Sequence, residues 1–310
     1  MKRQSRLLGT LMLTLLATFG CIDPGLETVG APRPDLATVA KPPPGGAPRE
    51  IAFVTNGGVQ AMAADGSNLA TITSPTLPIL GVSWRPGGAA VAYYGVHSVD
   101  GGIFRVNADG TNTLRLLTQQ DCGGSCSDPV WSPTGGEIAV IGHHSDQPAS
   151  YTLLVVPEMG GPPQVLYTDS QLLWDVAWRS DGMQLALLAD RGANDALLVV
   201  DRAGPPFVPP VQRLEFPGSV QEVDWARLGS NTVAFTGGSN SVWSIYLFDV
   251  VAPGAAPVRL VQNARWPSFS PDNRYIVYQD TNYSTNLLKV NVSTGATTRL
   301  RKGRYPDWKR

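Results

Sequence analysis

Short apolar runs alternate with turn-forming residues from residue 50 onward. In the clearest unit an aromatic residue is followed by a polar turn and then by an apolar run: Val130-Trp131-Ser-Pro-Thr-Gly-Gly-Glu-Ile-Ala-Val140. Glycine in the turn adopts positive φ angles at little cost, so the chain reverses within a few residues. The unit therefore predicts two antiparallel strands joined by a tight turn.

This unit recurs with a regular period. Its anchor aromatics are 47, 47, 47 and 44 residues apart, at Trp84, Trp131, Trp178, Trp225 and Phe269. Two more apolar segments follow in most repeats, for example residues 151–156 and 164–168 after Trp131. A period in the forties with four strand-like segments is typical of a β-propeller, in which each repeat forms one blade.

The two ends of the repeat region determine the number of blades. Residues 50–55 read as a second strand that no aromatic segment precedes, and Tyr305-Pro-Asp-Trp308 supplies the missing first strand. The sequence thus predicts an all-β fold, a six-bladed β-propeller over residues 50–310. Each blade has four antiparallel strands, and one blade is shared between the N- and C-terminal segments.

The first 49 residues have a different character. Three basic residues precede an uncharged run of 13, Leu7–Phe19, which is too short to span a bilayer but has the length of a signal-peptide core. We predict a signal peptide over 1–20 and a proline-rich tether over 21–49. Gly20-Cys21 resembles the cleavage site of bacterial lipoproteins, which implies lipidation of Cys21, with ordinary cleavage nearby as the alternative. The chain is expected to be exported to the periplasm or cell surface.

Charge and cysteine content narrow the partners. The formal net charge is −1 and charged residues make up 16% of the chain, so no basic face for nucleic acid is expected. Apart from Cys21, the cysteines are Cys122 and Cys126, and an even pair in an oxidising compartment favours a disulfide. A zinc site would need further ligands, and the three histidines lie in other segments.

The repeat resembles that of TolB-type propellers, also called WD40-like or PD40 repeats. The resemblance covers residues 50–310 and is best at Trp131-Ser-Pro-Thr-Gly with Ile138-Ala, and at Asn107-Ala-Asp-Gly110 with Leu117-Thr118. It weakens where Ala226 replaces the serine and Phe269 replaces the tryptophan. The resemblance implies a propeller that binds other proteins. TolB also has an N-terminal domain, for which the tether leaves no room, so its own role is not transferred.

One face of such a propeller is the usual binding surface. It contains the loops from fourth strand to next first strand and those from second to third. Aromatic, arginine and histidine residues predicted there are candidate partner-binding residues: Trp174, Arg265, Trp266, His97, His143, His144, Arg191 and Tyr283. For Trp174 and Trp266, packing between blades is the alternative. Adjacent strand residues point to opposite faces, which argues against a metal site at His143 and His144.

Three consecutive repeats place a carboxylate three residues before the anchor aromatic, at Asp128, Asp175 and Glu222. They are expected at the same mouth of the central channel, where they would bind Ca²⁺ or a basic residue of a partner. Hydrogen bonding to nearby backbone amides is the interpretation we favour. No cofactor is otherwise expected.

The predicted function is a non-catalytic binding or scaffold propeller of the cell envelope that recognises a protein partner through loops on one face. The chain contains no Gly-x-Ser-x-Gly motif for a hydrolase nucleophile. The alternatives are a propeller-type enzyme related to lyases or peptidases, and a binder of a glycan or small molecule.

Overall fold

Every regular element in the described residues is a β-strand. The computed structural model describes residues 47–97, 100–145, 150–203, 210–239, 242–252, 254–282 and 285–310. The predicted signal peptide, Cys21, nearly all of the tether and Tyr283 lie outside these ranges. Within them no helix is long and apolar enough to cross a membrane.

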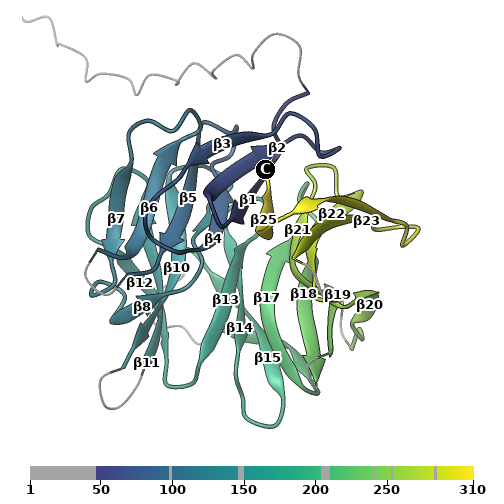
Figure 1. Cartoon of the computed structure of the whole chain (residues 1–310). Helices are drawn as coiled ribbons and strands as arrows, with labels where there is room; N and C mark the ends of the chain where they lie inside the picture. The colour runs from purple at the N-terminus through teal and green to yellow at the C-terminus, as the bar shows by residue number, and fades with distance from the viewer. Residues whose placement is uncertain are drawn as a thin grey trace, which may run out of the picture. The chain divides into compact units, whose positions relative to one another are not determined.

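The strands form six antiparallel sheets that surround a central channel as the blades of a propeller (Figure 1). Five sheets have four strands, and the sixth, blade 3, has five. From the inner strand outward, blade 1 consists of β25 (Arg304–Trp308), β1 (Ile51–Thr55), β2 (Gly58–Met62) and β3 (Ala70–Thr73). Blade 2 consists of β4 (Ile79–Trp84), β5 (Ala90–Gly95), β6 (Gly102–Asn107) and β7 (Leu114–Thr118). Blade 3 consists of two short inner strands, β8 (Gly124–Cys126) and β9 (Val130–Trp131), followed by β10 (Glu137–His144), β11 (Ser150–Pro157) and β12 (Gln164–Asp169). Blade 4 consists of β13 (Leu173–Trp178), β14 (Gln184–Ala189), β15 (Asp195–Asp201) and β16 (Val211–Phe216). Blade 5 consists of β17 (Ser219–Trp225), β18 (Thr232–Ser239), β19 (Val242–Asp249) and β20 (Val258–Gln262). Blade 6 consists of β21 (Ala264–Phe269), β22 (Tyr275–Asp280), β23 (Asn286–Asn291) and β24 (Thr297–Lys302).

Blade 1 closes the ring as the sequence predicts. Its inner strand β25 pairs antiparallel with β1, with Trp308 opposite Ile51 and Asp307 opposite Ala52. Figure 1 shows the yellow β25 beside the purple β1. The Lys309 amide also donates to the Glu50 carbonyl at 2.7 Å. This pairing satisfies backbone groups that an open ring would expose at two free edges.

Blade 3 departs from the predicted four-strand pattern. Its inner strand is split into β8 and β9, and both parts pair with β10. The structure confirms the predicted disulfide, which joins Cys122, just before β8, to Cys126, the last residue of β8. Both cysteines are buried against blade 2. The bridge encloses a loop of five residues, and the strand resumes only at Val130, so a segment predicted as one loop contains a short strand.

The hydrophobic core lies between neighbouring blades. One cluster joins Trp178 of blade 4 to Ile141 and Val155 of blade 3, and another joins Trp131 of blade 3 to Ile103 of blade 2. All six anchor aromatics, including Trp308, are at most 3% exposed. A buried aromatic side chain removes about 150–250 Å² from water, which contributes about 4–6 kcal/mol at most. Each anchor therefore fastens one blade to the next.

Candidate functional site

A β-bulge interrupts the inner strand shortly before the anchor aromatic in five blades. The register shifts within β25, β4, β13, β17 and β21 opposite their partner strands. At three of these bulges the third residue before the anchor has positive φ: Gly81 at 74°, Trp266 at 54° and Tyr305 at 49°. A bulge redirects a side chain out of the regular alternation. The third residues before the six anchors all line a cavity in the central channel: Gly81, Asp128, Asp175, Glu222, Trp266 and Tyr305.

In four blades, the side chain of the residue directly before the anchor accepts a hydrogen bond from a backbone amide of the next blade around the channel. Ser83 Oγ accepts a hydrogen bond from the Trp131 amide at 3.0 Å, and Ser268 Oγ accepts one from the Trp308 amide at 2.9 Å. Carboxylates do the same elsewhere: Asp224 Oδ2 accepts from the Phe269 amide, and Asp307 Oδ2 from the Trp84 amide, both at 2.7 Å. These bonds join four pairs of adjacent blades.

Blades 3 and 4 use another arrangement, because the residue before the anchor there is apolar, Val130 or Ala177. In blade 4 the link comes from Asp175, two residues earlier. Its Oδ1 accepts from the Val176 amide at 2.8 Å, and its Oδ2 from the Val223 amide of blade 5 at 2.9 Å. For Asp175, backbone hydrogen bonding is therefore the observed arrangement, as we favoured from the sequence.

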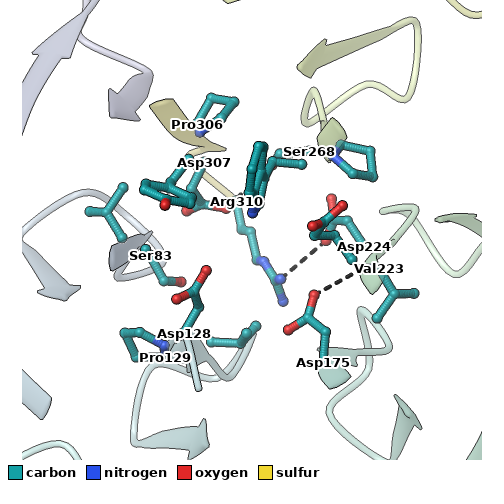
Figure 2. Close-up of a pocket in the computed structure, with 17 residues that line it drawn as sticks. Ser83, Asp128, Pro129, Asp175, Val223, Asp224, Ser268, Pro306, Asp307 and Arg310 are labelled. Carbon is teal, nitrogen blue, oxygen red and sulfur yellow. Dashed lines mark hydrogen bonds and ion pairs between the residues drawn. The ribbon is translucent and has the colours of Figure 1, made fainter. Parts of the chain in front are cut away.

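Two arginines meet the carboxylates on one side of the channel. Arg227 is buried and donates from Nη1 and Nη2 to the two oxygens of Asp224, both at 2.9 Å. Arg310 extends into the channel, and its Nη2 lies 3.3 Å from Asp224 Oδ1 (Figure 2). Burial lowers the pKa of Arg310 to about 10, and the charge of Arg227 adds to this effect. The guanidinium still carries its charge at neutral pH.

On the opposite side of the channel, Asp128 and Asp175 form no ion pair with any other residue that the structure describes. Figure 2 shows Asp128 and Asp175 pointing toward the space into which Arg310 extends. Burial raises the pKa of Asp128 to about 7, with a further contribution from the charge of Glu222. Burial also raises the pKa of Asp175 well above its usual value. Among the described residues, no three His, Cys, Asp or Glu side chains are grouped to hold a metal ion, so the calcium hypothesis receives no support.

Asp128 is closely packed against blade 2. A Cβ added to Gly81 would lie 2.2 Å from the Asp128 Cγ. Gly81 also has positive φ. Both facts explain why glycine stands there, whereas the corresponding bulge positions in blades 6 and 1 carry Trp266 and Tyr305.

Arg265 forms a cluster at the channel mouth with residues of blades 5 and 6. Its Nε donates to Glu222 Oε1 at 3.0 Å, and its Nη2 donates to Glu222 and Gln221. The guanidinium carbon lies 4.3 Å from the ring centre of Trp266 and 4.9 Å from that of Trp243. Trp266 in turn contacts Tyr305 edge to face, with ring centres 4.8 Å apart. The carboxylate and the two rings together hold the guanidinium in place.

A second cavity of about 440 Å³ adjoins this cluster between blades 5 and 6. The channel cavity, in contrast, measures about 70 Å³. Trp266 lines both cavities. The second cavity is lined by Trp243, Arg265, Trp266, Gln279, Asp280, Thr281 and Thr285. The structure therefore brings together three predicted residues, Glu222, Arg265 and Trp266, beside a cavity that the sequence did not reveal.

The other predicted binding residues lie apart from this cluster. Trp174 packs against the hydrophobic cluster between blades 4 and 5, which corresponds to the packing alternative considered from the sequence. Arg191, which follows β14 of blade 4, pairs with Asp169 of blade 3 at 2.6 Å. His97 accepts a hydrogen bond from the Asp100 amide at 3.1 Å in blade 2.

The two adjacent histidines of blade 3 have different surroundings. His143 packs edge to face on Tyr151, and burial lowers its pKa. The ring of His144 lies so close to Gly123 that a Cβ there would be 2.1 Å from its Nδ1. The structure thus gives these residues separate contacts. Tyr283 lies outside the described residues.

Several site residues escaped the sequence analysis. Asp224 and Asp307 occupy the position before the anchor that serine holds in two other repeats, so alignment of that column reveals them. Arg227 follows Asp224 by three residues, within the turn after the anchor. Trp243, Gln279 and Asp280 come from the ends of strands in two blades, and no spacing in the sequence indicates that they share a cavity.

The blades, the closure and the channel define a six-bladed β-propeller. Residues 49–308 match the TolB β-propeller domain, and the chain belongs to this family. TolB from Acinetobacter baumannii is similar in structure, with 19% sequence identity and a TM-score of 0.68 over 86% of this chain and 67% of that one.

Other propellers resemble the chain in fold alone. A chain of a nidogen/laminin complex matches with 11% identity and a TM-score of 0.69, over 84% of this chain and 98% of that one. An oligogalacturonate lyase in complex with manganese matches with 12% identity and a TM-score of 0.53, over 78% of this chain and 74% of that one. No curated protein sequence gives a significant match.

Proposed function

We propose that this protein is a non-catalytic binding propeller of the cell envelope, which recognises a protein partner through the face around the Arg265 cluster. Membership of the TolB propeller family supports a scaffold role. The observation that carries the proposal is the position of Arg265 between Trp243 and Trp266 at the channel mouth.

Arginine and tryptophan dominate the binding energy of many protein interfaces, especially where neighbouring side chains already fix their conformation. The ion pair with Glu222 and the contacts with two rings fix Arg265 before a partner arrives. Its side chain is 21% exposed, so a partner can still reach it. The cluster therefore has the composition and the rigidity of an interface hot spot.

Asp128 is the described channel residue that most suggests chemistry, because a carboxyl with a pKa of about 7 suits general acid–base catalysis, whereas burial raises the pKa of Asp307 to about 6. The cavity beside it measures about 70 Å³, however, which accommodates a few water molecules and not a substrate. Burial accounts for the raised pKa without a catalytic role. This combination favours binding over catalysis.

Export and anchoring through Cys21 belong to the same proposal. The Cys122–Cys126 disulfide supports an oxidising compartment. Expression of the full chain in a bacterial host, followed by fractionation, tests the anchor. The wild type is expected in the membrane fraction, and Cys21→Ser in the soluble exported fraction. Recovery of both proteins in the same fraction would contradict lipidation.

Photo-crosslinking in the native envelope tests the binding face. A photoreactive residue replaces Gln171 or Gln262, two exposed side chains near the connections from a fourth strand to the next first strand: Gln171 follows β12, and Gln262 ends β20. The control position is Gly136, in an opposite-face turn where a Cβ meets no atom within 4 Å. We expect a discrete protein adduct from Gln262 or Gln171 and none from Gly136. Equal adducts from all three positions, or none from any, would contradict the proposal.

A further inference from the structure

The cavity between blades 5 and 6 contains a buried polar group without a partner. Gln279 lines this cavity and is 8% exposed, and its Oε1 has no hydrogen bond among the described residues. It stands opposite Arg265 in the pairing of β21 with β22. An unpaired buried amide oxygen is costly, so its retention is explained if a ligand supplies the missing donor.

Arg265 supplies the opposite kind of group. Its Nε and Nη2 are engaged by Glu222 and Gln221. Its Nη1 forms no hydrogen bond with the described residues, so it remains available as a donor in the cavity lining. The same cavity therefore presents an acceptor and a donor on neighbouring strands. Asp280, Thr281 and Thr285 add a carboxylate and two hydroxyls.

Charge limits the ligand further. The carboxylate of Glu222 neutralises Arg265, whereas no cation is paired with Asp280 among the described residues, and its Oδ1 accepts from the Asn282 amide at 2.8 Å. An anionic ligand would be repelled by Asp280 and would find Arg265 already paired. A neutral ligand that carries both donors and acceptors meets every group of the lining.

Trp243 adds an apolar wall to this polar lining. The cavity volume of about 440 Å³ is within the range of small-molecule sites. Sugar hydroxyls act as donors and as acceptors at once, and a pyranose ring also has an apolar C–H face that packs on an aromatic ring. We propose that this cavity binds a neutral saccharide, an activity beyond the recognition of a protein partner.

In this arrangement one hydroxyl donates to Gln279, a second accepts from Arg265 Nη1, and the sugar ring lies against Trp243. A peptide segment of a partner also presents donors and acceptors, but it offers them singly along an extended backbone. The cavity is open to solvent, but its polar groups come from two neighbouring strands and the loop after them, which fits a compact polyhydroxylated ring better.

The test uses the purified full chain on an array of neutral, amino and acidic glycans, followed by calorimetric titration with the neutral glycan that binds best. The variants are Gln279→Leu, which removes the acceptor, and Trp243→Ala, which removes the wall. Trp243→Phe retains an aromatic wall. Asn194→Ala is the matched control, since it removes an amide on the corresponding loop of blade 4, where Asn194 contacts Glu215. Melting temperatures establish that each variant is folded.

We expect a neutral glycan to bind, about tenfold or more weakening in Gln279→Leu and Trp243→Ala, and less weakening in Trp243→Phe. Asn194→Ala should bind like the wild type. Absence of any neutral glycan ligand would overturn the proposal, as would preference for acidic glycans or binding that Gln279→Leu leaves unchanged. Mapping of a partner peptide into the cavity would also overturn it. Crosslinking at Gln171 and Gln262 tests the protein partner separately, so failure of one proposal leaves the other intact.

Discussion

The two sides of the central channel differ in their electrostatics. On one side, Asp224 is paired with Arg227 and Arg310 and accepts a hydrogen bond from the next blade. On the other side, Asp128 and Asp175 form no ion pair with any described residue, and burial raises the pKa of both. Carboxylates that line one channel are thus paired with arginine on one side and left without a cation on the other.

This difference separates structural carboxylates from available ones. A buried carboxylate that pairs with a guanidinium and joins two blades is costly to remove, because the guanidinium is then left buried without the negative charge that compensates its own. A buried carboxyl without a cationic partner, such as Asp128, keeps its proton to a higher pH and responds to any cation or proton that reaches it. Four changes, in decreasing order of expected effect, test whether the two sides differ in this way.

Removal of residues 305–310 eliminates the inner strand of blade 1 together with Asp307 and Arg310. Because β1 then loses its pairing with β25 and the Trp84 amide loses its acceptor, Asp307, we expect no cooperative unfolding transition. Urea unfolding followed by fluorescence and circular dichroism measures this. Trp308→Phe retains the strand and should still unfold cooperatively. A normal transition in the truncated chain would disprove closure through a shared blade.

Asp224→Ala leaves Arg227 buried beside no carboxylate and the Phe269 amide without its acceptor. We expect a loss of about 3–5 kcal/mol in the free energy of unfolding. Asp128→Ala, on the other side of the channel, should cost much less at pH 8. Similar losses in the two variants would show that the sides are equivalent.

Asp128→Asn should change the pH dependence of stability. The unfolded carboxyl loses its proton near pH 3.8 and the folded one near pH 7, so the folded state holds the extra proton between these values. Rising pH therefore destabilises the wild type through this residue, and the cost is complete above pH 7. Relative to wild type, Asp128→Asn should gain about 4 kcal/mol between pH 4 and pH 8. A pH-independent difference in chemical unfolding would contradict the burial of an unpaired carboxyl.

Ser83→Ala removes a neutral link between blades 2 and 3, and leaves the buried Trp131 amide without its acceptor. We expect a loss of about 1–2 kcal/mol in the free energy of unfolding. The exposed Thr297→Ala on β24 should change it by less than about 0.5 kcal/mol. A loss from Ser83→Ala as large as that from Asp224→Ala would mean that charge adds nothing to these links.

The repeat pattern predicted the fold almost completely, because each blade repeats a local arrangement of an aromatic anchor, a tight turn and an apolar strand. The column of Asp128, Asp175 and Glu222 was found in the same way. The ion pairs of the channel were not found, since Arg265, which pairs with Glu222, and Arg227 and Arg310, which pair with Asp224, hold no repeated position in the sequence. Blade 3 shows a further limit: the Cys122–Cys126 pair was predicted, but the strand β8 that ends at Cys126 was not.

The Arg265 cluster is the centre of the proposed binding face, and crosslinking in a variant tests it most directly. The photoreactive residue is placed at Gln262 in the wild type and in Arg265→Ala, and the yield of the protein adduct is measured at equal protein levels, with melting temperatures as a check on folding. The account predicts a discrete adduct in the wild type and its loss in folded Arg265→Ala. An adduct of equal yield in both proteins would contradict a partner-binding role for this cluster.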